Sequence, residues 1–220
     1  MKEQEPIVFI IDDDRQVRDG LHGLIRSVGL RAETFASAQD FLQAKRPDAP
    51  ACAILDVRMP GLSGLDLQLK LSEADMQLPI IFITGHGDIP MSVGAVKAGA
   101  IEFLTKPFSD EVLLTAIRQA LERSRLALTE QATMQELRDR YASLTPREQD
   151  VMRLVVSGLL NKQVADELGI TESTVKAHRG QVMQKMKANS LADLVKMTAR
   201  LDQPVATNQS MSSGLRENAG

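Results

Sequence analysis

The chain has 220 residues, of which 43% are hydrophobic and 25% are charged, and its single cysteine excludes an internal disulfide. This composition is typical of a globular protein and excludes a disulfide-rich scaffold or a low-complexity chain. No apolar run is long enough to cross a bilayer, and the polar, acidic first residues are unlike a signal peptide. We therefore expect a cytoplasmic protein with no membrane partner.

Charge is divided unevenly along the chain. Residues 1–124 carry 13 Lys and Arg against 18 Asp and Glu, whereas residues 144–201 carry 9 against 6. An acidic half followed by a basic half favours contact of the second half alone with a polyanion.

Short apolar runs alternate with amphipathic stretches through residue 124. Strands that alternate with helices in this way predict an α/β unit, with a five-stranded, doubly wound parallel sheet. The predicted strands are Ile7–Ile11, Arg31–Phe35, Ala51–Leu55, Ile80–Thr84 and Ile101–Leu104, and the predicted helices cover residues 15–28, 37–46, 64–74, 90–98 and 110–124.

The last of these helices is expected to continue beyond the sheet unit. No Gly or Pro occurs between Ser109 and Thr145, which favours a helical linker over residues 125–143. The helical spacing of its apolar residues slips in phase around residues 129–133. A self-associating linker and a merely solvated helix both remain open.

A second, all-α unit of four helices is predicted over residues 144–203. Thr145-Pro146-Arg147-Glu148 has the pattern of a helix start with a capping box, and Gly169 marks a tight turn between two helices. The predicted helices lie near residues 146–157, 161–168, 171–186 and 190–201, and the polar tail over 204–220 is expected to be disordered.

Acidic residues follow two of the predicted strands where these strands end. Asp12 and Asp13 follow the first strand, and Asp56 follows the third. Neighbouring carboxylates repel one another, and a divalent cation such as Mg²⁺ relieves that repulsion. Thr84 ends the fourth strand and Lys106 follows the fifth. This set suits phosphoryl transfer to a carboxylate, with a hydroxyl and an ammonium binding the phosphoryl oxygens.

Residues 6–124 resemble a response-regulator receiver domain, which has a flavodoxin-like fold. The resemblance rests on four runs, Ile11-Asp12-Asp13-Asp14, Leu55-Asp56-Val57-Arg58-Met59-Pro60-Gly61, Ile83-Thr84-Gly85-His86-Gly87-Asp88 and Phe103-Leu104-Thr105-Lys106-Pro107-Phe108. It implies that Asp56 accepts the phosphoryl group, which Thr84 and Lys106 then bind. It implies an Mg²⁺ ion held by Asp13, Asp56 and the Arg58 backbone carbonyl, with Asp12 assisting through water. It also implies a cis Lys106-Pro107 bond and a switch role for Phe103.

Residues 144–201 resemble the LuxR-type helix-turn-helix, and the whole chain looks most like the FixJ subfamily of response regulators. The resemblance rests on Leu144-Thr145-Pro146-Arg147-Glu148, Asn161-Lys162-Gln163-Val164-Ala165 and the run from Thr174 to Met186. It implies DNA contacts at Lys162, Thr174, Lys176, Ala177 and Arg179, and a dimer surface at Leu191, Leu194, Val195 and Thr198. Gly180 departs from the pattern, because many such domains carry a basic residue there.

The resemblance implies a two-component response regulator. A sensor histidine kinase would phosphorylate Asp56, and the resulting homodimer would bind double-stranded promoter DNA and act on RNA polymerase, with activation favoured. Such a chain is no enzyme beyond its own phosphoryl transfer and dephosphorylation. Two alternatives are weaker. A haloacid-dehalogenase-type phosphatase places its nucleophile after the first strand, and a receiver that works without phosphate usually lacks one of the acidic, Thr or Lys residues.

Overall fold

The computed structural model describes residues 5–45, 47–85 and 99–202, and it divides into two compact units between Thr129 and Glu130. The helix expected at 90–98 and the tail over 204–220 lie outside the described residues. No helix in the described part of the chain is both long and apolar enough to cross a membrane.

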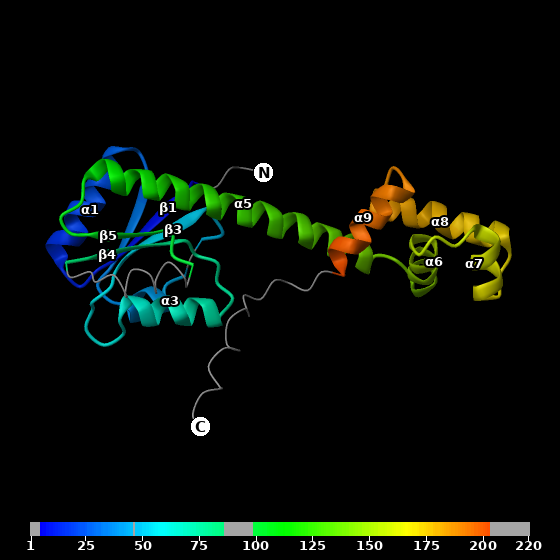
Figure 1. Ribbon diagram of the computed structural model, residues 1–220, viewed down its shortest axis with the longest axis horizontal. Coiled ribbons are helices and arrows are strands. Elements are labelled where there is room, and N and C mark those ends of the chain that lie inside the picture. Colours follow the sequence, from blue (N-terminus) through cyan, green and yellow to red (C-terminus); the bar gives the residue numbers. More distant parts are fainter. Residues whose placement is uncertain (1–4, 46, 86–98, 203–220) are drawn as a thin grey trace, which may run out of the picture. The chain divides into compact units, whose positions relative to one another are not determined.

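A parallel five-stranded sheet forms the centre of the first unit (Figure 1). β1, β3 and β4 are buried along their whole length, which explains why their sequences are almost continuously apolar. The observed sheet confirms the predicted fold class, with strand bounds within one residue of those expected. The strands are β1 (Ile7–Ile11), β2 (Arg31–Phe35), β3 (Ala51–Asp56), β4 (Ile80–Thr84) and β5 (Glu102–Thr105), in the order β2-β1-β3-β4-β5.

Helices cover both faces of the sheet (Figure 1). On one face, α1 (Arg15–Ser27) and the first half of α5 (Asp110–Ala142) bury an aliphatic cluster that includes Ile25 and Ile117. On the other face, α2 (Ala38–Gln43) and α3 (Gly64–Glu73) bury a cluster that contains most of the aromatic rings. The two clusters take alternate residues of the same strands, so the sheet has an apolar core on each side.

The start of α3 lies directly against the end of β3. Ser63 and Asp66 form a capping box that begins the helix, and Gly64 N donates to Val57 O at 3.0 Å. A Cβ atom at Gly64 would collide with the backbone carbonyl oxygen of Asp56. Only glycine therefore allows this helix to begin so close to the strand end that carries Asp56.

The second unit is all-α, as predicted. It contains α6 (Pro146–Val156), α7 (Asn161–Leu168), α8 (Glu172–Met186) and α9 (Leu191–Leu201), together with the end of α5. Leu137 and Met134 of α5 belong to the same apolar cluster as Leu194 of α9, and Arg200 forms an ion pair with Glu130 at 2.6 Å. The segment expected to be a separate linker thus has its C-terminal part packed within the second unit.

A partly buried ion pair connects the start of α6 to the end of α8. Thr145 N donates to Glu148 Oε2 at 2.8 Å, which closes a capping box. The same oxygen accepts from Lys185 Nζ at 2.7 Å, and only 5% of Glu148 is exposed. The hydrogen bond from Lys185, and after it that from Thr145, lowers the pKa of Glu148 below its ordinary value.

This ion pair should make the second unit sensitive to acid. Because folding lowers the pKa of Glu148 from 4.5, the stabilisation is complete above about pH 4.5 and is lost as the pH falls further. Glu148→Gln keeps a capping side chain but not the charge, and we expect it to lower the free energy of unfolding by about 1–2 kcal/mol at neutral pH.

Tyr141 provides the measurement, because the chain has one Tyr and no Trp, and Tyr141 lies in the second unit. Its fluorescence during urea unfolding should show the variant less stable than the original protein at pH 7, and the difference should shrink as the pH falls below 4.5 and through the lowered pKa of Glu148. A difference that stays constant over this range would show that the charge of Glu148 is not its source.

Candidate functional site

Two acidic side chains leave neighbouring strands at the same edge of the sheet. The strand register pairs Ile11 with Leu55 and Asp56 with Ile83, so Asp12, which follows β1, lies beside the end of β3. Both carboxylates are buried, with Asp12 1% and Asp56 7% exposed. Burial of two like charges side by side requires a compensating cation.

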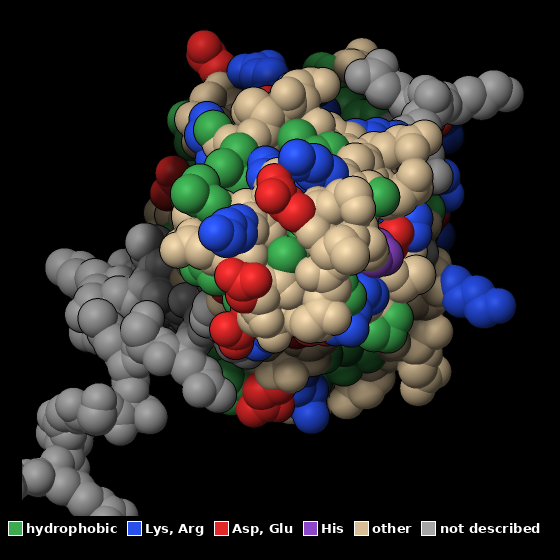
Figure 2. All heavy atoms as spheres, turned by 90° about the vertical axis from the view of Figure 1, so that its right-hand side faces the viewer, with side chains coloured by type: hydrophobic (Ala, Val, Ile, Leu, Met, Phe, Trp, Pro, Cys, Tyr) green, Lys and Arg blue, Asp and Glu red, His purple; other side chains and the backbone are tan. Residues whose placement is uncertain are grey.

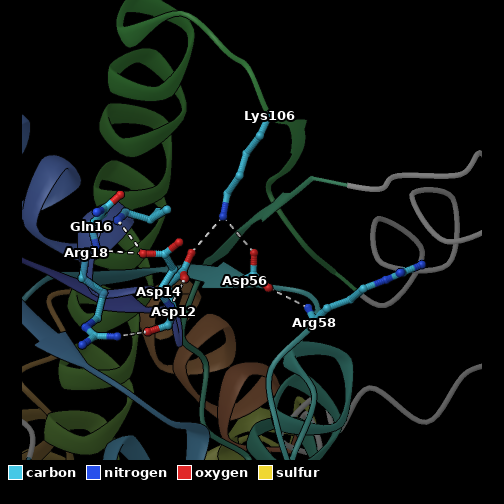
Figure 3. Close-up of polar contacts among 8 residues, drawn as sticks. Asp12, Asp14, Gln16, Arg18, Asp56, Arg58 and Lys106 are labelled. Atoms are coloured by element: carbon cyan, nitrogen blue, oxygen red, sulfur yellow. Dashed lines mark hydrogen bonds and ion pairs between the residues drawn. The ribbon is translucent and has the colours of Figure 1, made fainter.

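Lys106 supplies this cation from the end of β5. Its Nζ donates to Asp12 Oδ2 at 2.9 Å and to Asp56 Oδ1 at 3.0 Å, and Figure 3 shows the side chain reaching in between the two carboxylates. The structure thus brings together three residues that lie far apart in the sequence, as the motif predicts.

Backbone groups hold the remaining carboxylate oxygens. Asp12 Oδ1 accepts from Asp14 N at 2.8 Å, and Asp56 Oδ2 accepts from Arg58 N at 2.7 Å. The side chain of Arg58 points away from the cluster (Figure 3). Arg18 Nη1 donates to the backbone oxygen of Asp12 at 2.6 Å, which ties α1 to the same strand end. Each carboxylate is therefore oriented by one backbone N–H and by Lys106.

Burial and ion pairing have opposite effects on the pKa values of Asp12 and Lys106. Burial raises the pKa of Asp12, and the hydrogen bond from Lys106 lowers it only in part. For Lys106, burial acts to lower the pKa, but the hydrogen bonds to Asp12 and Asp56 prevail and raise it. Lys106 is therefore a permanent cation at neutral pH, placed where negative charge collects.

Thr84 and Phe103 lie on β4 and β5, the strands that lead to this edge of the sheet. Thr84 ends β4 and is 1% exposed, and its backbone oxygen accepts from Lys106 N at 2.7 Å. Phe103 in β5 is half-buried, with its ring centroid 6.2 Å from that of Phe82. The Lys106-Pro107 peptide bond is cis, which confirms the expectation.

The donors expected to hold Mg²⁺ are all oxygen atoms. Asp12 and Asp56 are buried, Asp13 is exposed, and Arg58, whose carbonyl is the remaining donor, lies two residues beyond the end of β3. Among the described residues, no group of three acidic, His or Cys side chains already converges on one point. The set has the oxygen chemistry that Mg²⁺ prefers, and its three carboxylates exceed the single charge of Lys106. The donor set therefore fits this ion.

The second unit presents a helix-turn-helix in α7 and α8. Gly169 ends α7 with φ of 65°, and Thr171 caps α8 by accepting from Thr174 N at 3.2 Å. Thr174 is half-buried against this cap, whereas Lys162, Lys176 and Ala177 are exposed. In Figure 2, acidic side chains lie among the basic ones on the visible face, so no continuous basic patch stands out there.

Arg179 and Leu194 make contacts within the second unit that the sequence interpretation did not anticipate. Arg179 is half-buried, and its Nη1 donates to Asn161 Oδ1 of α7 at 2.6 Å, so it does not stand on the outward face of α8. Leu194 is 1% exposed and belongs to the core of the second unit. Leu194 lies in the interior of the unit and Arg179 lies at its edge, because α8 and α9 each bury one face against α6 or α5.

On α9, the large apolar residues that are exposed are Leu191 and Val195, at 42% and 40%. They stand four residues apart and so share one face of the helix. Thr198 is half-buried, and its hydroxyl donates to Leu194 O at 2.9 Å.

The sequence interpretation overlooked Asn161 as a structural partner. The sequence does contain a sign that Arg179 faces inward. Arg179 lies four residues after Val175 and three before Val182, on the stripe of α8 that faces the core. A charged residue on such a stripe requires a partner inside the protein.

Two family models match the chain, one in each unit. The model described as "Response regulator receiver domain" matches residues 8–118, and the model described as "Bacterial regulatory proteins, luxR family" matches residues 142–198.

The similar proteins cover most of the chain. Nodulation protein W of Bradyrhizobium diazoefficiens is 54% identical over 89% of this chain and 86% of its own length. The transcriptional regulatory protein FixJ of the same organism is 42% identical over 88% of this chain and 94% of its own length. Among solved structures, the response regulator StyR matches with a TM-score of 0.82 at 50% identity, over 90% of this chain and 100% of that one.

Proposed function

Because this chain belongs to the FixJ-like response regulators, which join a receiver domain to a LuxR-type DNA-binding domain, we propose that phosphorylation of Asp56 controls its action as a transcription regulator. The observation that carries this proposal is the pair of hydrogen bonds from Lys106 Nζ to Asp12 and Asp56, at 2.9 and 3.0 Å. They set a permanent cation beside a carboxylate whose orientation is fixed, at the carboxyl edge of the sheet.

The phosphoryl donor is a phosphohistidine of a sensor kinase. A carboxylate oxygen of Asp56 attacks phosphorus, the P–N bond to the histidine breaks, and the histidine nitrogen recovers its electron pair. Lys106 Nζ lies 3.0 Å from Asp56 Oδ1 and neutralises the charge of the incoming phosphoryl oxygens. The Thr84 hydroxyl binds one of these oxygens. Asp13, Asp56 and the Arg58 carbonyl, with Asp12 assisting through water, would hold Mg²⁺, which would supply further positive charge beside the phosphoryl oxygens. No enzyme activity beyond this self-modification is assigned.

Phosphorylation changes the conformation of residues in and next to β5. The group added to Asp56 competes for Lys106, which now bridges Asp56 to Asp12. Thr84 turns toward the phosphoryl group, and the half-buried Phe103 follows into the space that it leaves. The surface of the receiver that carries β5 changes, and two receivers then associate.

The second unit binds double-stranded promoter DNA as a dimer. Lys162 at the start of α7 contacts the phosphate backbone, and the exposed residues of α8 around Lys176 and Ala177 enter the major groove. The exposed face of α9 around Leu191 and Val195 pairs the two copies. Pairing makes the second half-site contact intramolecular, which raises affinity, and the bound dimer acts on RNA polymerase.

Treatment of the full-length protein with a small phosphodonor and Mg²⁺ tests this function. We expect a mass increase of one phosphoryl group on a peptide containing Asp56, and tighter binding to a genomic fragment by footprinting. Absence of the adduct, or an adduct without any change in DNA binding, would contradict the proposal.

A further inference from the structure

Arg179 occupies an inward position on a helix whose outward residues are proposed to read DNA. The stripe of α8 that contacts the core is Val175, Val182 and Met186, all at most 1% exposed, and Arg179 lies on the same stripe between Val175 and Val182. The half-buried Arg179 lines an apolar depression whose other residues are Val151, Met152, Val155, Val182, Met183 and Leu194. Its side chain therefore lies over α6 and not on the exposed face of the helix.

The guanidinium group of Arg179 is bound inside the second unit. Nη1 donates to Asn161 Oδ1 at 2.6 Å, across 18 residues of sequence, from the middle of α8 to the first residue of α7. A charged donor makes this hydrogen bond about twice as strong as a neutral one. The bond thus fixes the start of α7 against the centre of α8.

A helix-turn-helix needs one residue that anchors it on phosphate and a helix face that reads the bases. The two residues of this hydrogen bond lie next to these two features. Asn161 precedes the exposed Lys162, which is suited to a phosphate contact. Arg179 lies between the exposed Ala177 and Gly180, and a Cβ atom at Gly180 would meet nothing within 4 Å. Because Gly180 has no side chain, the outward face of α8 can approach the DNA major groove closely at this position.

We propose that Arg179 is a positioning residue, which through Asn161 sets the register between the phosphate anchor at Lys162 and the base-reading face of α8. The inference rests on the proposed DNA binding and changes the role of Arg179 within it. Hydrogen bonds to base edges require accurate placement of α8 in the groove, whereas attraction to phosphates is long-ranged and tolerant of small shifts. Loss of the Arg179–Asn161 bond should therefore reduce discrimination between sequences more than it reduces general affinity.

The test compares Arg179→Met, Asn161→Ala and the double variant in the full-length protein treated with phosphodonor and Mg²⁺. The probes are a duplex that the original protein selects from a random pool and a scrambled duplex of equal length. Lys176→Ala is the matched control, an exposed cation on the same helix. Tyr141 fluorescence confirms that each variant is folded at the assay temperature.

We expect Arg179→Met to bind the selected duplex about tenfold more weakly and the scrambled duplex within about twofold of the original protein. The slope of log affinity against log salt should remain unchanged, whereas Lys176→Ala should reduce it by about one. Asn161→Ala should reproduce the loss, and the double variant should be no weaker than Arg179→Met alone. Asn161→Asp retains the acceptor oxygen and should preserve discrimination.

Three results would overturn the proposal. A salt slope reduced in Arg179→Met as in Lys176→Ala would make Arg179 a phosphate contact. Equal losses on both duplexes would exclude a role in discrimination, and a lower melting temperature with unchanged discrimination would leave Arg179 a purely structural residue. Failure of the proposed DNA binding itself would look different, because the original protein would then select no duplex from the pool.

Discussion

Asp56→Asn should reduce incorporation of a phosphoryl group from a small phosphodonor at least about a hundredfold, because an amide lacks the anionic oxygen that attacks phosphorus. The fold should survive the change. The amide oxygen can still accept from Arg58 N, which donates to Asp56 Oδ2 at 2.7 Å in the original protein. Phosphate content per chain, measured by mass spectrometry after a fixed time with phosphodonor and Mg²⁺, gives the result.

Asp14→Asn is the matched control for this experiment. Asp14 is exposed and caps α1 by accepting from Gln16 N at 2.7 Å, a task that Asn performs equally well. This variant should be phosphorylated like the original protein. The assignment of Asp56 is wrong if Asp56→Asn takes up phosphate as readily as Asp14→Asn does. With Asp56 assigned correctly, Asp56→Asn should also lose every phosphodonor-dependent change in DNA affinity.

Gly64→Ala should destabilise the first unit by about 3 kcal/mol, the upper end of the effect of overpacking a buried site. The new methyl group would collide with the backbone oxygen of Asp56 and would also lie 3.1 Å from Leu55 Cγ. Backbone cannot yield as a flexible side chain does, so the start of α3 must move away from the end of β3. The same movement should slow phosphorylation, because it displaces the peptide that carries Asp56.

Gly23→Ala is the control, since a Cβ atom there would meet nothing within 4 Å and the residue lies inside α1. Alanine should stabilise this helix by up to about 1 kcal/mol. Far-UV circular dichroism follows urea unfolding of the helices in both units, and Tyr141 fluorescence follows the second unit alone, so a transition seen only by circular dichroism belongs to the first unit. If both alanine variants unfold at the same urea concentration, the close approach of α3 to β3 carries no energetic consequence.

The elements of this protein could be located from local patterns alone. Buried parallel strands require apolar residues without interruption, and Ile7–Ile11 and Ile80–Thr84 were bounded correctly for that reason. Capping residues such as Thr145 and Gly169 mark helix ends through hydrogen bonds to neighbours a few residues away. Parallel pairing then carries Asp12 and Asp56 to one edge, because consecutive strands of an alternating α/β chain end on the same side.

Contacts between distant segments needed the folded structure. A helical pattern distinguishes two faces, but it does not say which neighbours a long polar side chain meets. The resemblance to LuxR-type domains assigned Arg179 to DNA, whereas in the folded unit it lies over α6 and donates to Asn161. Leu194 was assigned to a dimer surface, whereas α5 and α8 bury it. The end of α5 belongs to the core of the second unit because Leu137 and Met134 pack against apolar residues there. Those residues are distant in the sequence, so local patterns do not predict the contact.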